Sequence, residues 1–172
     1  TLLNFYYMQT GNSNRVLFDR IANSIHVQKH DRIPYFHCHG VIPINGYNAR
    51  KGHLASDKLV LTEDNYLELA NNSFSWQATS FIDNCMNRRV VFCGVSLTDA
   101  NMRRWLSWIH ANKMAEFKEN GLDCKDATEH FWICKKPNTI QEKIWLEESV
   151  AHLGVRLVWI DEWNQTGKVL KR

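Results

Sequence analysis

The second half of the chain alternates between two hydrophobic patterns, and this alternation constrains the fold more than any other feature. Short apolar runs rich in β-branched and aromatic residues are separated by segments with a helical period. The order is strand, helix, strand, helix, strand, over 89–94 (RVVFCG), Asp99 to about Phe117, 130–135 (HFWICK), 139–153 and 155–160 (VRLVWI). Strands that alternate with helices in this way form parallel sheets covered by helices. We therefore predict an α/β domain with a mostly parallel sheet, in which the run 89–94 is buried on both faces.

The first half carries weaker signals. Strands are expected over Ile33 to Cys38 and over 58–61 (KLVL), and helices over 62–72 and 73–89. The helix at 73–89 should bury one apolar face, made of Phe74, Ala78, Phe81, Ile82, Cys85 and Met86. Residues 1–10 resemble the tail of a helix, 11–31 give no clear pattern, and 41–58 are turn-rich.

Three local signals mark helix ends. Thr62 can cap the helix that follows it, because its hydroxyl can accept a hydrogen bond from a backbone N–H group of the first turn. Asp99 can cap the long helix in the same way, and Gly154 suits the position that ends the last helix.

Composition and charge exclude several classes of function. The formal net charge is only +3, with acids and bases interleaved, which argues against a nucleic-acid platform. No run of about 18 apolar residues and no signal peptide are visible, so we expect neither a membrane span nor export. The five cysteines are odd in number and form no CxxC pair, which favours a reducing cytoplasm over a disulfide framework.

The stretch VVFCGVSLTDANMRRWL contains a turn at which a ligand could bind. A strand ends at Gly94, Ser96 follows, and Asp99 opens a helix. Ligands of α/β sheets sit beyond the carboxyl ends of strands, and a glycine there lets a ligand approach the backbone. The alternative is a well-capped turn without a ligand.

The stretch YFHCHG (35–40) allows three interpretations. His37 and His39 would lie on one face of an extended strand, so they could share a metal, although the sequence offers no further pair at ligand spacing. One of them could instead be a general base at a strand end, where Gly40 admits substrate. The third interpretation is two packed or hydrogen-bonded histidines. Similarly, Glu63, Asp64 and Glu68 could be site acids, but a solvated helix face explains them better.

Taken in order, YFHCHG, LVLTEDNY, VVFCGVSLTDANMRRWL and LGVRLVWID resemble the sirtuin-like NAD-binding domain, in particular its divergent branch in bacterial defence proteins. The resemblance covers about Thr1 to Asp161. It implies a Rossmann-like α/β fold, with NAD as the substrate. It also implies that His39, directly before the glycine, is the catalytic histidine, and that Gly94, Val95 and Ser96 hold the NAD ribose. Cys134 would lie near the adenine side.

Two departures from the family refine this expectation. Protein-deacylating sirtuins carry a zinc ribbon with two CxxC pairs after the HG, and this chain has none, so we expect no metal and favour NAD hydrolysis. The family's glycine-rich phosphate turn and its Asn-x-Asp motif are also not found before His39. We therefore expect residues 1–172 to be a single sirtuin-like domain that lacks its N-terminal phosphate-binding half, and to be inactive by itself.

The leading functional hypothesis is a cytoplasmic NAD glycohydrolase, which converts NAD to nicotinamide and ADP-ribose in a bacterial defence or NAD-depletion system. The alternatives are an NAD-dependent protein deacylase and a module that senses NAD or ADP-ribose, or oligomerises, without turnover. For partners we expect NAD and a second copy of the chain, with room for a companion domain or regulatory partner, and neither nucleic acid nor membrane.

Overall fold

A computed structural model gives the fold in two compact units, 1–77 and 78–172, which are described separately below. The structure describes 18–22, 33–39, 60, 62–72, 74–124 and 130–170. The helix tail expected at 1–10 and the turn-rich loop expected at 41–58 lie outside these residues.

The first unit contains a two-stranded parallel sheet and a helix. Strand β1 (Phe18–Ile21) pairs with β2 (Ile33–Phe36), and Ile21 lies opposite Phe36. The segment 11–31 had given no pattern, so β1 was missed, whereas β2 falls within the strand predicted from Ile33. Of the strand expected at 58–61, the described residue Val60 is in no strand, but its N–H donates to the carbonyl of His39 at 3.1 Å.

Helix α2 (Glu63–Asn71) confirms the helix predicted in the first unit. The Thr62 hydroxyl accepts a hydrogen bond from the backbone N–H of Asn65 at 3.2 Å, which is the predicted N-cap. The acids Glu63, Asp64 and Glu68 are all exposed, as expected for a solvated helix face.

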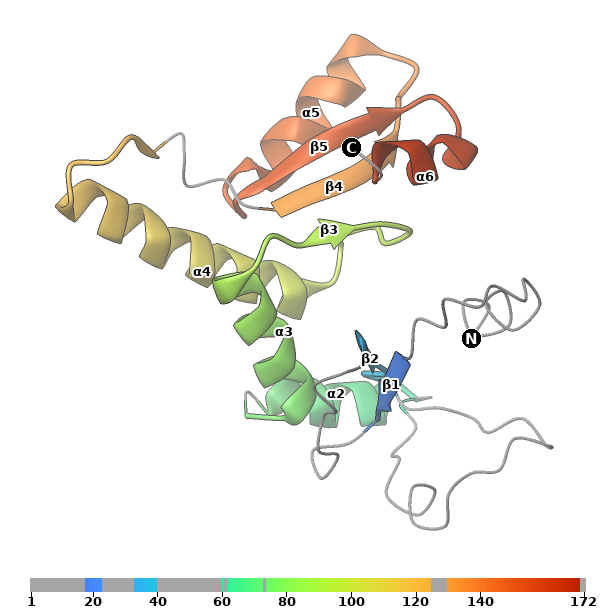
Figure 1. Cartoon of the computed structure of the whole chain (residues 1–172), viewed down its shortest axis with the longest axis vertical. Coiled ribbons are helices and arrows are strands. Elements are labelled where there is room, and N and C mark those ends of the chain that lie inside the picture. Colours follow the sequence, from blue (N-terminus) through green and yellow to red (C-terminus); the bar gives the residue numbers. More distant parts are fainter. Residues whose placement is uncertain are drawn as a thin grey trace. The chain divides into compact units, whose positions relative to one another are not determined.

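The second unit is built on a parallel sheet of three strands in the order β3-β4-β5, and a helix lies in each connection between successive strands (Figure 1). The strands are β3 (Val91–Phe92), β4 (His130–Lys135) and β5 (Val155–Ile160). The helices are α3 (Trp76–Asn87), whose last ten residues belong to this unit, α4 (Ala100–Glu119), α5 (Ile140–Ala151), the short 3-10 turn η2 (Trp163–Gln165) and α6 (Thr166–Val169). This arrangement confirms the predicted α/β class and its parallel sheet.

The helix ends follow the predicted chemistry. The Asp99 carboxylate accepts from the backbone N–H of Met102 at 2.8 Å and begins α4, and Thr139 accepts from Glu142 and begins α5. Helix α5 ends at Ala151, and Gly154 then takes a φ of +69°, which favours glycine. The turn at Gly154 leads directly into β5.

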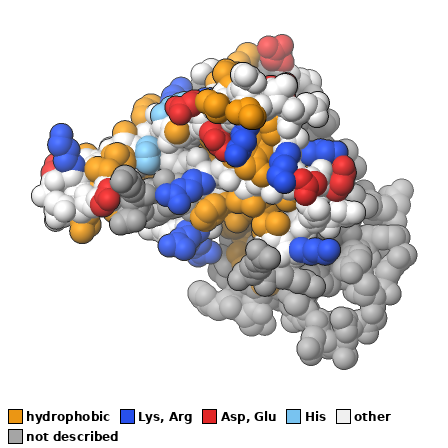
Figure 2. All heavy atoms as spheres, turned by 90° about the horizontal axis from the view of Figure 1, so that it is seen from above, with side chains coloured by type: hydrophobic (Ala, Val, Ile, Leu, Met, Phe, Trp, Pro, Cys, Tyr) orange, Lys and Arg blue, Asp and Glu red, His pale blue; other side chains and the backbone are white. Residues whose placement is uncertain are grey.

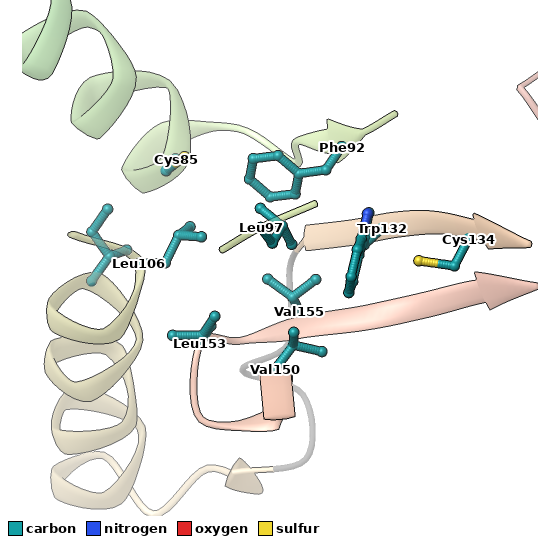
Figure 3. Packing of buried hydrophobic residues seen from close by; sticks show 10 residues of the cluster. Cys85, Phe92, Leu97, Leu106, Trp132, Cys134, Val150, Leu153 and Val155 are labelled. Carbon is teal, nitrogen blue, oxygen red and sulfur yellow. The ribbon is translucent and has the colours of Figure 1, made fainter. Parts of the chain in front are cut away.

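One hydrophobic cluster joins the elements of the second unit (Figure 3). Its members are Cys85 from α3, Phe92 from β3, Leu97, Leu106 and Ile109 from α4 and the turn before it, Trp132 and Cys134 from β4, and Val150, Leu153 and Val155 from α5, β5 and the turn between them. Figure 3 shows Leu97 pointing into this cluster beneath the ring of Phe92. The turn that precedes α4 is therefore anchored in the core by one of its own side chains.

Two predictions about burial are wrong. The segment 89–94 is not buried on both faces, because β3 is only two residues long and Val91 is 43% exposed at the edge of the described sheet. The apolar face of α3 is shorter than expected, because the helix begins at Trp76, which leaves Phe74 before it and 92% exposed. Met86 at the other end of α3 is exposed as well, whereas Ala78 and Cys85 are buried.

Among the helices that the structure describes, none combines the length and the apolar character needed to cross a membrane.

Candidate functional site

The predicted catalytic histidine lies in a turn at the end of β2. The backbone N–H of His37 still donates to the carbonyl of Ile21 at 2.8 Å, which extends the β1–β2 ladder by one residue. The chain then leaves the sheet, so Cys38 and His39 form a turn. His39 is exposed at this turn, and its carbonyl is held by the N–H of Val60. The imidazole of His39 is therefore accessible to a substrate, while the hydrogen bonds at the His37 N–H and the His39 carbonyl hold the backbone on either side of Cys38.

The premise that both histidines share one strand face is wrong. His37 is half-buried, and its ring meets that of Tyr35 edge-on with 4.7 Å between the ring centroids, whereas His39 is exposed in the turn. The alternation of a strand ends at Phe36, so it cannot align the two side chains. Within the described part of the chain, no three His, Cys, Asp or Glu side chains are grouped so that they could hold a metal ion.

The predicted ligand turn joins β3 to α4 in the second unit. Gly94 has a φ of +70°, a conformation that side-chain-bearing residues rarely adopt. Apart from its chain neighbours, no atom of the described residues lies within 4 Å of a Cβ built on Gly94, so this part of the structure leaves the space in front of the glycine open. Gly94, Val95 and Ser96 are exposed together at the carboxyl end of β3. This is the end of a parallel strand at which α/β folds bind ligands.

The hydroxyl groups of the turn face one another. Ser96 Oγ and Thr98 Oγ1 are 2.7 Å apart and share a hydrogen bond. Both residues are exposed, so a ligand oxygen can replace either partner. The pair gives the turn a donor and an acceptor in addition to its backbone groups.

The remaining candidate, Cys134, is a core residue. Its side chain belongs to the buried cluster, and burial raises the pKa of its thiol to about 11. It therefore stays a neutral thiol at neutral pH and packs against apolar neighbours, which does not support the expectation of a contact with the adenine.

A second surface, which the sequence did not indicate, lies where β4 ends and α5 begins. An open hollow of about 550 Å³ is lined by Lys135, Lys136, Pro137, Asn138, Glu142, Trp145 and Leu146. Its lysines are already paired, Lys135 with Glu162 at 2.9 Å and Lys136 with Asp161 at 2.7 Å. On the face drawn in Figure 2, acidic and basic side chains are likewise interspersed with apolar ones.

Of the five residues predicted for the site, Gly94, Val95 and Ser96 are consecutive and form one turn of the second unit. His39 belongs to the first unit, at the end of another parallel strand.

A family model described as the SIR2-like domain matches residues 2–153 of the chain. The chain belongs to the SIR2-like domain family. The match includes both β2 with its His39 turn and the β3–α4 turn, so the predicted family is confirmed over both parts of the predicted site. SIR2-like domains use NAD, and the function of this SIR2-like domain is accordingly related to NAD. A comparison with curated protein sequences found no match.

Proposed function

We propose that this SIR2-like domain hydrolyses NAD to nicotinamide and ADP-ribose. The observation that carries the proposal is the β3–α4 turn, in which a left-handed Gly94, with space that the described residues leave open before it, is followed by an exposed Ser96. A glycine, exposed backbone groups and a hydroxyl at the carboxyl end of a parallel strand suit the ribose and phosphate oxygens of a dinucleotide.

The proposed base is His39. In the reaction, the bond between C1′ of the ribose and the nicotinamide nitrogen breaks, and its electron pair leaves with nicotinamide. A water oxygen forms the new bond to C1′, and the proton that the water loses passes to His39 and then to solvent. The exposure of His39 in a turn fixed by its own carbonyl supports this role.

The sequence between His39 and the β3–α4 turn favours hydrolysis over protein deacylation. No cysteine occurs between Cys38 and Cys85, whereas deacylating sirtuins place the CxxC pairs of their zinc ribbon after the HG. NAD hydrolysis that depletes a cell of NAD fits a bacterial defence system, which is the setting that we propose for this domain.

The test is nicotinamide release from NAD by the full-length protein and by its His39→Ala variant. We expect the variant to lose a factor of about 10²–10⁴ in rate, since this is the usual contribution of a general base, while NAD still binds. Release at the wild-type rate would remove His39 from the mechanism. Acyl-ADP-ribose formed only when an acylated peptide is added would establish deacylation instead.

A further inference from the structure

The β3–α4 turn is held from the protein interior by two side chains that belong to other elements. Trp132 of β4 is buried, and its indole Nε1 donates to the carbonyl of Val95 at 2.9 Å. Arg103 of α4 donates from Nη1 to the carbonyl of Leu97 at 3.2 Å. The same guanidinium donates from Nη2 to the carbonyl of Ser149 in α5 at 2.8 Å, which fixes its position.

The outer side of the turn carries the complementary groups. Within the described part of the chain, the backbone N–H groups of Gly94, Val95 and Ser96 donate to no partner, and all three residues are exposed. The turn therefore directs its carbonyls toward donors in the protein and its N–H groups toward solvent. Backbone N–H groups arranged in this way can bind a phosphate or a ribose oxygen.

The backbone conformation of the turn depends on contacts with the rest of the second unit. Leu97 has a φ of +51°, which is unfavourable for a residue with a branched side chain. The turn keeps this φ because the Leu97 side chain is buried and the Leu97 carbonyl is bound by Arg103. Removing either support should let the turn relax toward more common backbone angles.

We propose that Trp132 and Arg103 are positioning residues of the nucleotide-binding turn. They hold the carbonyls of Val95 and Leu97 inward, and this orients the N–H groups and the Ser96 hydroxyl toward NAD before NAD arrives. The role in NAD binding rests on the proposed function, whereas the clamp itself is a property of the protein without ligand.

The sharpest variant is Trp132→Phe, because it removes the Nε1 donor and keeps an aromatic ring in the core. Its matched control is Trp159→Phe. The Trp159 indole donates to the exposed Glu147 carboxylate at 3.0 Å, so the control makes the same substitution and removes an indole hydrogen bond away from the turn. Arg103→Met removes the second clamp, and Arg103→Lys restores a charged donor that can reach one carbonyl at a time.

Two measurements on the full-length protein test the positioning role of Trp132 and Arg103. We expect hydrogen exchange of the backbone amides of 94–98, measured without NAD, to become faster in Trp132→Phe and Arg103→Met but not in Trp159→Phe. The Kd for NAD should rise about tenfold in Trp132→Phe and Arg103→Met, since each variant loses one hydrogen bond to the turn, and such a bond contributes about 1 kcal/mol. Arg103→Lys should recover part of the affinity. In turnover, KM should rise while kcat changes little, since His39 is untouched.

Unchanged exchange at 94–98 in folded Trp132→Phe and Arg103→Met would overturn the clamp. Faster exchange with an unchanged Kd would overturn its role in binding. If the wild-type protein itself does not bind NAD, the proposed function fails, and the exchange measurement still decides alone whether the two side chains hold the turn.

Discussion

His110 of α4 packs against Gly154 so closely that a Cβ atom on the glycine would lie 2.6 Å from the imidazole Nδ1. The contact joins α4 to the turn between α5 and β5, and Gly154 also requires its φ of +69°. Two reasons therefore keep a glycine at this position, one conformational and one steric.

We predict that Gly154→Ala lowers the free energy of unfolding by about 2–4 kcal/mol, the sum of a left-handed alanine and a displaced neighbour. Gly121→Ala is the matched control, because Gly121 has a φ of +65°, but no described residue other than its chain neighbours comes within 4 Å of a built Cβ. The control should lose only about 1–2 kcal/mol. Urea unfolding of both variants checks this, and equal losses would show that the His110 contact is soft.

The stability of the protein should fall as the pH is lowered through the histidine range. Burial, then the nearby charges of His152 and Lys113, hold the pKa of His110 below its ordinary value of 6.5. The unfolded chain therefore binds a proton at a higher pH than the folded protein does. The stability is complete above about pH 6.5 and decreases below it, until the folded protein also takes up the proton.

The variant His110→Gln should flatten this part of the pH dependence. Unfolding free energies measured between about pH 7.5 and 5.5 for the wild type and the variant isolate the contribution of His110, because the other histidines are common to both. Parallel curves would contradict the assignment.

The variant Gly94→Val should weaken NAD binding more than it lowers stability. Apart from the chain neighbours, no atom of the residues that the structure describes lies within 4 Å of a Cβ built at this position. The expected loss of stability is therefore the cost of a left-handed backbone for a residue with a side chain, about 1–2 kcal/mol. A ligand seated on the turn would meet the new side chain directly. Calorimetric titration with NAD beside a melting curve tests this, and a folded variant with unchanged affinity would place NAD elsewhere.

The cysteines should differ widely in reactivity toward a thiol reagent. Cys93 is exposed, whereas burial raises the pKa of Cys85 to about 12 and that of Cys134 to about 11. The thiolate is the reactive form, so at pH 8 Cys93 should be labelled first and Cys85 and Cys134 only after unfolding. Mass spectrometry of the labelled peptides gives the order, and early labelling of Cys134 would show that β4 opens in the native protein.

The sequence alone determined the class of the fold and the family. Strands β4 and β5 have the bounds that their apolar runs predicted, and the caps at Thr62 and Asp99 form as expected. These signals are local and depend on a few neighbouring residues. The glycine turn after β3 could also be predicted, since an apolar run, a glycine and a helix cap follow one another within 90–99.

Tertiary structure decided the rest. Strand β1 had no pattern of its own and exists through its pairing with β2. Cys134 is buried by residues that are distant in sequence. The hydrogen bonds of Trp132 to Val95 and of Arg103 to Ser149 likewise connect distant residues. The acceptor of the Trp132 indole is the carbonyl of Val95, and the packing of β4 against the β3–α4 turn determines this pairing.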